Sequence, residues 1–140
     1  MPIIEHAEVA VESTRVWVED GESGQRIGAS ITSVGEDLVV AVGGGEKPHV
    51  GCVVLAQPQP AKTKSGEWSA SCSVLTIPPH KEEPIARGIA SRLVEAFGRV
   101  TVVTAGIHDD NLDSKGIATY LRLGEELADK LVTHLTEADK

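Results

Sequence analysis

The stretch PIARGIASRLVEAFGRVTVVTAGIHDDNLD, residues 84–113, contains the change in hydrophobic periodicity that decides the fold. Its first half places apolar residues at spacings of three and four, which is typical of one face of a helix. Pro84 suits the first turn of such a helix, and Gly98 suits its C-terminal cap. The run VTVVTA at 100–105 is short and apolar throughout, as buried strands are. We therefore predict a helix, a buried strand and then a loop over 106–113.

A second, longer helix is predicted from about Ser114 to Thr136. Asp113 or Ser114 can cap the free N–H groups at its start. Its apolar residues recur at helical spacing, so we expect them to form the stripe that packs on the core. This predicted stripe consists of Ile117, Leu121, Gly124, Ala128, Leu131 and Leu135.

The residues before these helices have the alternating pattern of strands. Predicted strands cover 4–18, a run containing Ile27, Ala29 and Ile31, then 38–42, 51–57 and 68–77. Within 4–18 the alternation changes parity between Val9/Val11 and Val16/Val18, which predicts a bulge or bend near Ser13-Thr14. The sequence as a whole predicts an α+β fold, with a single mainly antiparallel sheet of five to six strands and two helices on one face.

The composition limits the classes of function. A chain of 140 residues is expected to form one domain, residues 1–140. Its 13 basic and 21 acidic side chains leave a net charge of −8, and it has only four aromatic residues, so we expect no nucleic-acid partner. It has no apolar run long enough to span a membrane and no basic, apolar leader, so we expect a cytoplasmic protein without a membrane partner. Cys52 and Cys72 lie in apolar strands and are expected to act as small buried hydrophobes.

Three of the five histidines lie where predicted elements join, and such loops are where sites are commonly built. His49 lies between two strands, His80 precedes the first helix, and His108 follows the buried strand. Helix starts offer free N–H groups and partial positive charge. With Lys81 and Arg87 added, this pattern is suited to binding an anionic group, most simply a phosphate.

Other interpretations of the same residues remain open. His49, His80 and His108 with Asp109 or Asp110 could supply ligands for zinc or a similar ion, which would favour a small metal-dependent enzyme. Each histidine could also be simply solvated. The glycine run 43–45 has the wrong spacing for a phosphate-binding loop and is interpreted as a flexible turn.

Three segments also carry a resemblance to a known family. They are GGGEKPHVG (43–51), IPPHKEEPIAR (77–87) and VTVVTAGIHDDN (100–111). In this order they resemble the LpdD-like prenylated-flavin chaperones, small D-type proteins associated with UbiD-like decarboxylases. The similarity runs from about residue 25 to 135.

This resemblance implies a dimeric α+β protein, similar to proteasome assembly chaperones, that performs no decarboxylation itself. It implies a homodimer that binds reduced prenylated FMN as cargo and assists its delivery to a UbiD-type decarboxylase. The residues expected to bind the cofactor are Lys47, His49, His80, Lys81, Arg87, His108 and Asp110. The flavin ring needs apolar cover, which Val50, Val53 and Leu55, or a dimer partner, would supply. A protein-assembly chaperone with no small-molecule ligand remains the alternative outside the enzymes.

Overall fold

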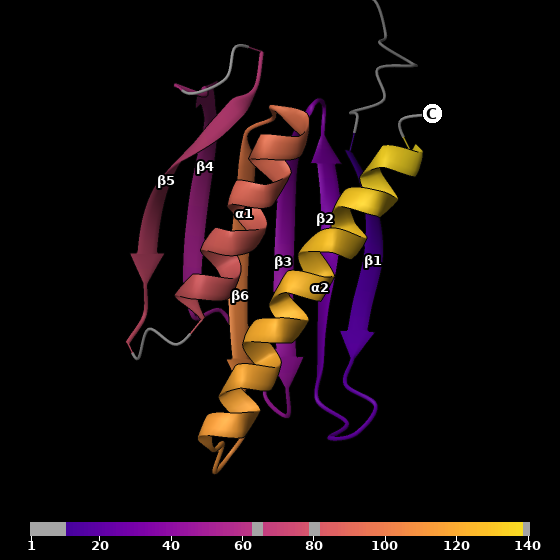
Figure 1. The fold of residues 1–140 in the computed structure, drawn as a ribbon, viewed down its shortest axis with the longest axis vertical. Coiled ribbons are helices and arrows are strands. Elements are labelled where there is room, and N and C mark those ends of the chain that lie inside the picture. The colour runs from indigo at the N-terminus through magenta and orange to yellow at the C-terminus, as the bar shows by residue number, and fades with distance from the viewer. Residues whose placement is uncertain (1–10, 63–65, 79–81, 139–140) are drawn as a thin grey trace, which may run out of the picture.

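The computed structural model describes residues 11–62, 66–78 and 82–138, and this part of the chain forms six strands and two helices (Figure 1). In chain order these are β1 (Val11–Glu19), β2 (Arg26–Val34), β3 (Asp37–Gly45), β4 (Cys52–Pro60), β5 (Trp68–Thr76), α1 (Glu83–Phe97), β6 (Thr101–His108) and α2 (Ser114–Ala138). None of the helices in these residues is sufficiently long and apolar to traverse a lipid bilayer.

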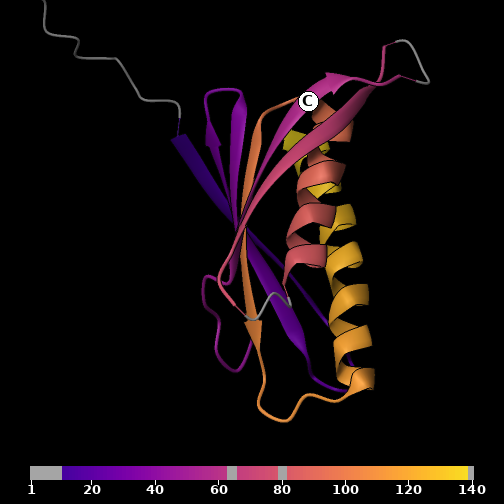
Figure 2. The ribbon, with the colours of Figure 1, turned by 90° about the vertical axis from the view of Figure 1, so that its left-hand side faces the viewer.

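The strands form one mixed sheet in the order β1-β2-β3-β6-β4-β5. β3 and β6 run parallel, and the other four neighbouring pairs are antiparallel. Figure 2 shows both helices on the same face of the sheet. The predicted α+β fold, a mainly antiparallel sheet with two helices on one face, is confirmed.

Of the bulge or bend predicted near Ser13-Thr14, the bulge is wrong. β1 pairs with β2 residue for residue, from Val11 opposite Val34 to Glu19 opposite Arg26. Val16 packs in the core, and the neighbouring Trp17 is 55% exposed, so apolar side chains of this strand are not confined to one face. The predicted strand residues 4–10 lie outside the described residues.

The core lies between the sheet and the helix layer. α1 packs on β4, β5 and β6, while α2 packs on β1 and β2 and against α1. Every second strand residue faces the helices, which is the two-residue period of a pleated strand. The largest fully buried side chains are Ile27, Leu38, Ile89, Leu93, Leu123, Leu127, Leu131, Val40, Val54, Val94, Val103 and Thr101.

The predicted helix ends are confirmed. Pro84 lies in the first turn of α1, and Gly98 closes the helix in the left-handed conformation (φ 64°) with its N–H donating to Val94. At the start of α2, the Asp113 Oδ1 accepts the N–H of Gly116 at 2.8 Å. Helix capping depends on residues that are close in sequence, so these helix ends can be predicted without the tertiary structure.

The predicted apolar stripe of α2 is partly wrong. Ile117 and Leu121 are 44% and 42% exposed, and Tyr120, Leu123 and Leu127 are buried. Both sets of residues have helical spacing, so periodicity alone does not tell which set faces the sheet. Gly124, Ala128, Leu131 and Leu135 are buried as predicted.

The glycine run 43–45 belongs to β3, and its prediction as a flexible turn is wrong. Because β6 lies between β3 and β4 in the sheet, the chain after β3 must cross the end of β6. A Cβ on Gly43 would lie 3.1 Å from the Pro48 ring, and one on Gly106 would overlap the carbonyl oxygen of His49. The missing side chains therefore let the crossing segment, residues 46–51, lie close to the sheet.

We expect Gly106→Ala to lower the free energy of unfolding by about 2–4 kcal/mol, because the crossing segment has to move away from β6. The same change at Gly88 is the control, since a Cβ there meets nothing within 4 Å. Gly88→Ala is expected to raise stability by up to about 1 kcal/mol through helix propensity. Urea unfolding measures both variants, and equal stability of the two would contradict the close crossing.

Candidate functional site

Four strands, β1, β3, β5 and β6, end at one end of the sheet, and both helices begin there. β3 ends at Gly45 and β6 at His108, side by side because the strands are parallel. α1 begins at Glu83 and α2 at Ser114 near the same end (Figure 1). Helix starts present free N–H groups and partial positive charge. This end therefore combines connecting segments held by a rigid sheet with two helix N-termini.

Four of the sequence-predicted residues meet here and are called the polar loop cluster: Lys47, His49, His108 and Asp110. The Lys47 Nζ lies 3.4 Å from Asp110 Oδ2, and His108 Nε2 lies 3.0 Å from Asp110 Oδ1. The backbone N–H of Lys47 donates to the carbonyl oxygen of His108 at 3.1 Å. His108 and Lys47 hydrogen bonds keep the pKa of Asp110 below its ordinary value. Both oxygens of Asp110 are thus used within the cluster.

Asp109, the neighbouring carboxylate, holds the local backbone in place. Its Oδ1 accepts the N–H of Glu46 at 2.7 Å, and its Oδ2 accepts the hydroxyl of Tyr120. Burial first, and then Asp109, raises the pKa of Tyr120 well above its ordinary value. Asp109 therefore ties the ends of β3 and β6 to α2, which accounts for both of its oxygens without a metal ion.

Glu82 is the one buried acidic side chain next to the polar loop cluster. Its side chain is 6% exposed, and its Oε1 lies 3.1 Å from His49 Nε2. The same oxygen accepts the N–H of Ile107 at 3.4 Å, at an edge of β6 that β4 does not reach. The second oxygen, Oε2, has no hydrogen-bond partner among the residues that the structure describes, and a Cβ on Gly51 would lie only 2.7 Å from it.

The hydrogen bonds of His49 determine where its protons lie. Its Nδ1 lies 3.0 Å from the carbonyl oxygen of Lys47, and because a carbonyl oxygen only accepts, Nδ1 carries a proton. Its Nε2 faces Glu82 Oε1 at 3.1 Å, so the imidazole bridges the Lys47 carbonyl and the buried carboxyl group. Glu82 also adds to burial in raising the pKa of the Cys52 thiol, which keeps that buried cysteine in its neutral form.

An apolar hollow of about 230 Å³ adjoins this buried acid. It lies between the starts of the two helices and the segment after β6. We call it the helix-start hollow, and its lining is Glu82, Pro84, Ile85, Ile107, Leu112, Ile117, Tyr120 and Leu121. Ile117 and Leu121, which the sequence placed in the core, form part of this wall.

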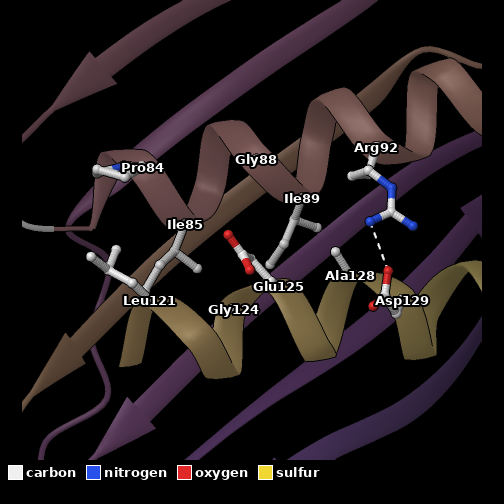
Figure 3. A pocket seen from close by; sticks show the side chains of 10 residues that line it. All are labelled: Pro84, Ile85, Gly88, Ile89, Arg92, Leu121, Gly124, Glu125, Ala128 and Asp129. Carbon is white, nitrogen blue, oxygen red and sulfur yellow. Dashed lines mark ion pairs between the residues drawn. The ribbon is translucent and has the colours of Figure 1, made fainter. Parts of the chain in front are cut away.

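A groove of about 490 Å³ continues between α1 and α2. Pro84, Ile85 and Leu121 line both the groove and the helix-start hollow, so the two adjoin. Figure 3 shows the groove, with Arg92 and Asp129 paired across it at 2.7 Å between Arg92 Nη1 and Asp129 Oδ1. Val50, Val53 and Leu55 were expected to cover an apolar ring of the ligand. The groove between the helices is a second candidate surface for that contact.

The other predicted site residues are placed differently. His80 and Lys81 lie outside the described residues. Arg87 pairs with Glu83 one turn away on α1, at 2.6 Å between Arg87 Nη2 and Glu83 Oε1, and makes no hydrogen bond or ion pair with the polar loop cluster. Within residues 11–62, 66–78 and 82–138, no group of three histidine, cysteine or acidic side chains is arranged to hold a metal ion.

Sequence reasoning did not assign the helix-start hollow or Glu82 to the site. Glu82 stands next to the predicted helix start in the resembling segment, but nothing in its sequence neighbourhood shows that it is buried. The exposure of Ile117 and Leu121 is likewise invisible to periodicity. These features depend on how the two helices and β6 pack together.

Comparisons with known proteins place the chain in a family. A family model described as "Prenylated flavin chaperone LpdD-like domain" matches residues 21–136. Protein LpdD of Lactiplantibacillus plantarum (strain ATCC BAA-793 / NCIMB 8826 / WCFS1) is 25% identical over 125 residues, which cover 85% of this chain and 87% of that protein.

Among solved structures, a chain of a chaperone complex for yeast 20S proteasome assembly has a TM-score of 0.62 at 18% identity. The match covers 90% of this chain and 98% of the other, so the two share a fold. The predicted similarity to proteasome assembly chaperones is confirmed at that level. The matched family is one of chaperones, which are accessory proteins rather than catalysts. The chain, matched over residues 21–136, belongs to the prenylated flavin chaperone LpdD-like family.

Proposed function

We propose that this protein binds reduced prenylated FMN as cargo and assists its delivery to a UbiD-type decarboxylase. The observation that carries the proposal is the position of the polar loop cluster beside the helix-start hollow. FMN has a phosphate, a polar ribityl chain and a large ring system, and it therefore needs a polar and an apolar surface next to each other. The family description names a prenylated flavin, which supports the same cargo.

The proposed site assigns the polar part of the cofactor to the connecting segments. Lys47, His49 and His108 carry donors for phosphate or hydroxyl oxygens. His80 and Lys81 directly precede Glu82 in sequence and are proposed to add to the phosphate site. Asp110 orients Lys47 and His108 through its two hydrogen bonds.

Arg87 is proposed as a further phosphate partner near the start of α1. It is about half exposed and paired with Glu83, so a phosphate would compete with that carboxylate for it. The site lies at an open end of the molecule rather than in a closed cavity, which suits a carrier that must release its cargo.

We further propose that the chain acts as a single domain over residues 1–140, in the cytoplasm, and as a homodimer. The sheet face opposite the helices presents exposed apolar side chains, among them Val39, Leu55 and Leu75. A contiguous apolar surface of this kind is characteristic of an interface. A C2 dimer through this face would cover it and leave both helix layers outside.

Anaerobic titration with reduced prenylated FMN tests the cargo directly. We expect saturable binding, and we expect Lys47→Ala and Lys81→Ala each to weaken it about ten-fold by removing a charged donor. The loss should be larger at low ionic strength, where charges are less screened. Lys62→Ala is the control, because Lys62 follows β4 at the opposite end of the sheet. Absence of binding of the reduced cofactor would refute the proposed cargo.

A separate experiment tests the delivery of the cofactor to a decarboxylase. An apo-decarboxylase of the UbiD type should gain activity faster and more completely from the loaded protein than from the same amount of free reduced cofactor, under anaerobic conditions. The unloaded protein is the control. Equal activation by free and carried cofactor would contradict a delivery role while leaving binding intact.

The proposed dimer interface predicts how one introduced charge changes the oligomeric state. Leu75, on β5, is 75% exposed. Leu75→Glu should convert the dimer to a monomer in light scattering at micromolar concentration, because burying an unpaired carboxylate in an apolar interface is costly. Thr133→Glu, on the exposed side of α2, should stay dimeric. A monomeric parent protein, or a dimeric Leu75 variant, would contradict this interface.

A further inference from the structure

The helix-start hollow is distinguished by its apolar lining. Ile107, Leu112, Ile117 and Leu121 contribute side chains from β6, the following loop and α2. Ile117 and Leu121 remain over 40% exposed, although large apolar side chains on a helix normally pack inward. Among the described residues, Ile117 and Leu121 therefore add apolar surface that no other side chain covers to a wall otherwise continuous with the core.

The size of the hollow limits what can fill it. Pockets that enclose a whole drug-sized ligand measure roughly 300–1,000 Å³. At about 230 Å³, the hollow suits one compact part of a larger molecule. The adjoining groove between α1 and α2 leaves room on one side, and the polar loop cluster lies on the other.

The buried carboxylate provides an independent observation. Glu82 is 5% exposed, and within residues 11–62, 66–78 and 82–138 its Oε2 is without a hydrogen-bond partner. A buried acceptor left unpaired is destabilising, and most such groups in proteins are paired. Oε1 is held in place by His49 and Ile107, and Glu82 lines the hollow, so Oε2 is the acceptor of this residue that remains to be paired.

We infer that the helix-start hollow is the subsite for the prenyl-bearing part of the flavin ring, with Glu82 Oε2 as the acceptor for a ring N–H. This inference rests on the proposed function. A phosphate is excluded from this subsite, because a carboxylate repels it and apolar walls cannot solvate it. The apolar walls instead cover prenyl-derived carbons, which plain FMN lacks.

The subsite therefore confers selectivity between two cofactors. Burying the additional apolar carbons should make reduced prenylated FMN bind at least about ten-fold more tightly than reduced FMN. The polar loop cluster should contribute equally to the affinity for both cofactors, because their phosphate and ribityl parts are the same. Substitutions in the apolar wall of the hollow should therefore change the selectivity between the two cofactors. Substitutions in the polar loop cluster should change the affinity for both.

The test measures dissociation constants for both reduced cofactors, anaerobically, with three variants. Ile117→Ser should weaken binding of prenylated FMN about ten-fold and binding of FMN by a clearly smaller factor. Glu82→Gln should weaken both about ten-fold, because the amide nitrogen that can replace Oε2 is a donor. Val34→Ser is the control, since Val34 is equally exposed (45%) but lies at the opposite end of the sheet. It should change neither constant.

Thermal unfolding of the unliganded variants separates binding from folding. If Glu82→Gln shifts the melting temperature but leaves both constants unchanged, Glu82 is purely structural and the subsite is refuted. The subsite is also refuted if Ile117→Ser weakens both cofactors equally, or neither. In those cases prenylated FMN still binds and the proposed function stands, whereas no binding by the parent protein overturns both.

Discussion

The parallel pairing of β3 with β6 inside an otherwise antiparallel sheet is the constraint on which the rest of the structure depends. Because β6 is inserted between β3 and β4, the chain after β3 must cross the end of β6 before β4 can begin. Parallel strands also end together, so the segments that follow them meet at one edge. The crossing requires glycine at 106, where a Cβ would overlap the carbonyl oxygen of His49, and it is tight at Gly43, where a Cβ would lie 3.1 Å from Pro48. Residues more than fifty positions apart are thereby brought into hydrogen-bonding distance.

The chemistry of the site follows from that crossing. Where residues 46–51 cross, one edge of β6 has no neighbouring strand. The N–H of Ile107 on that edge donates to Oε1 of the Glu82 side chain instead. His49 contacts the same oxygen, so the Glu82 side chain is oriented by groups from two distant parts of the chain, the crossing segment and β6.

Much of the fold could be predicted from local patterns. The ends of α1 were marked by Pro84 and Gly98, and the start of α2 by Asp113, because capping depends on a few adjacent residues. Errors arose where a pattern has two equivalent solutions. The stripe containing Ile117 and the stripe containing Tyr120 are both helical, and only packing against the sheet and α1 decides between them.

For the candidate site, the sequence by itself determined the chemical inventory: imidazoles and a lysine at loop positions, an acid beside them, and two helix starts nearby. Those properties are local, because they depend on residue type and on the ends of elements. The tertiary structure alone decided that Lys47, His49, His108 and Asp110 meet, that Arg87 pairs with Glu83 instead, and that an apolar hollow adjoins Glu82. Such contacts join residues far apart in the chain, and strand order and helix packing set them rather than any spacing along the sequence.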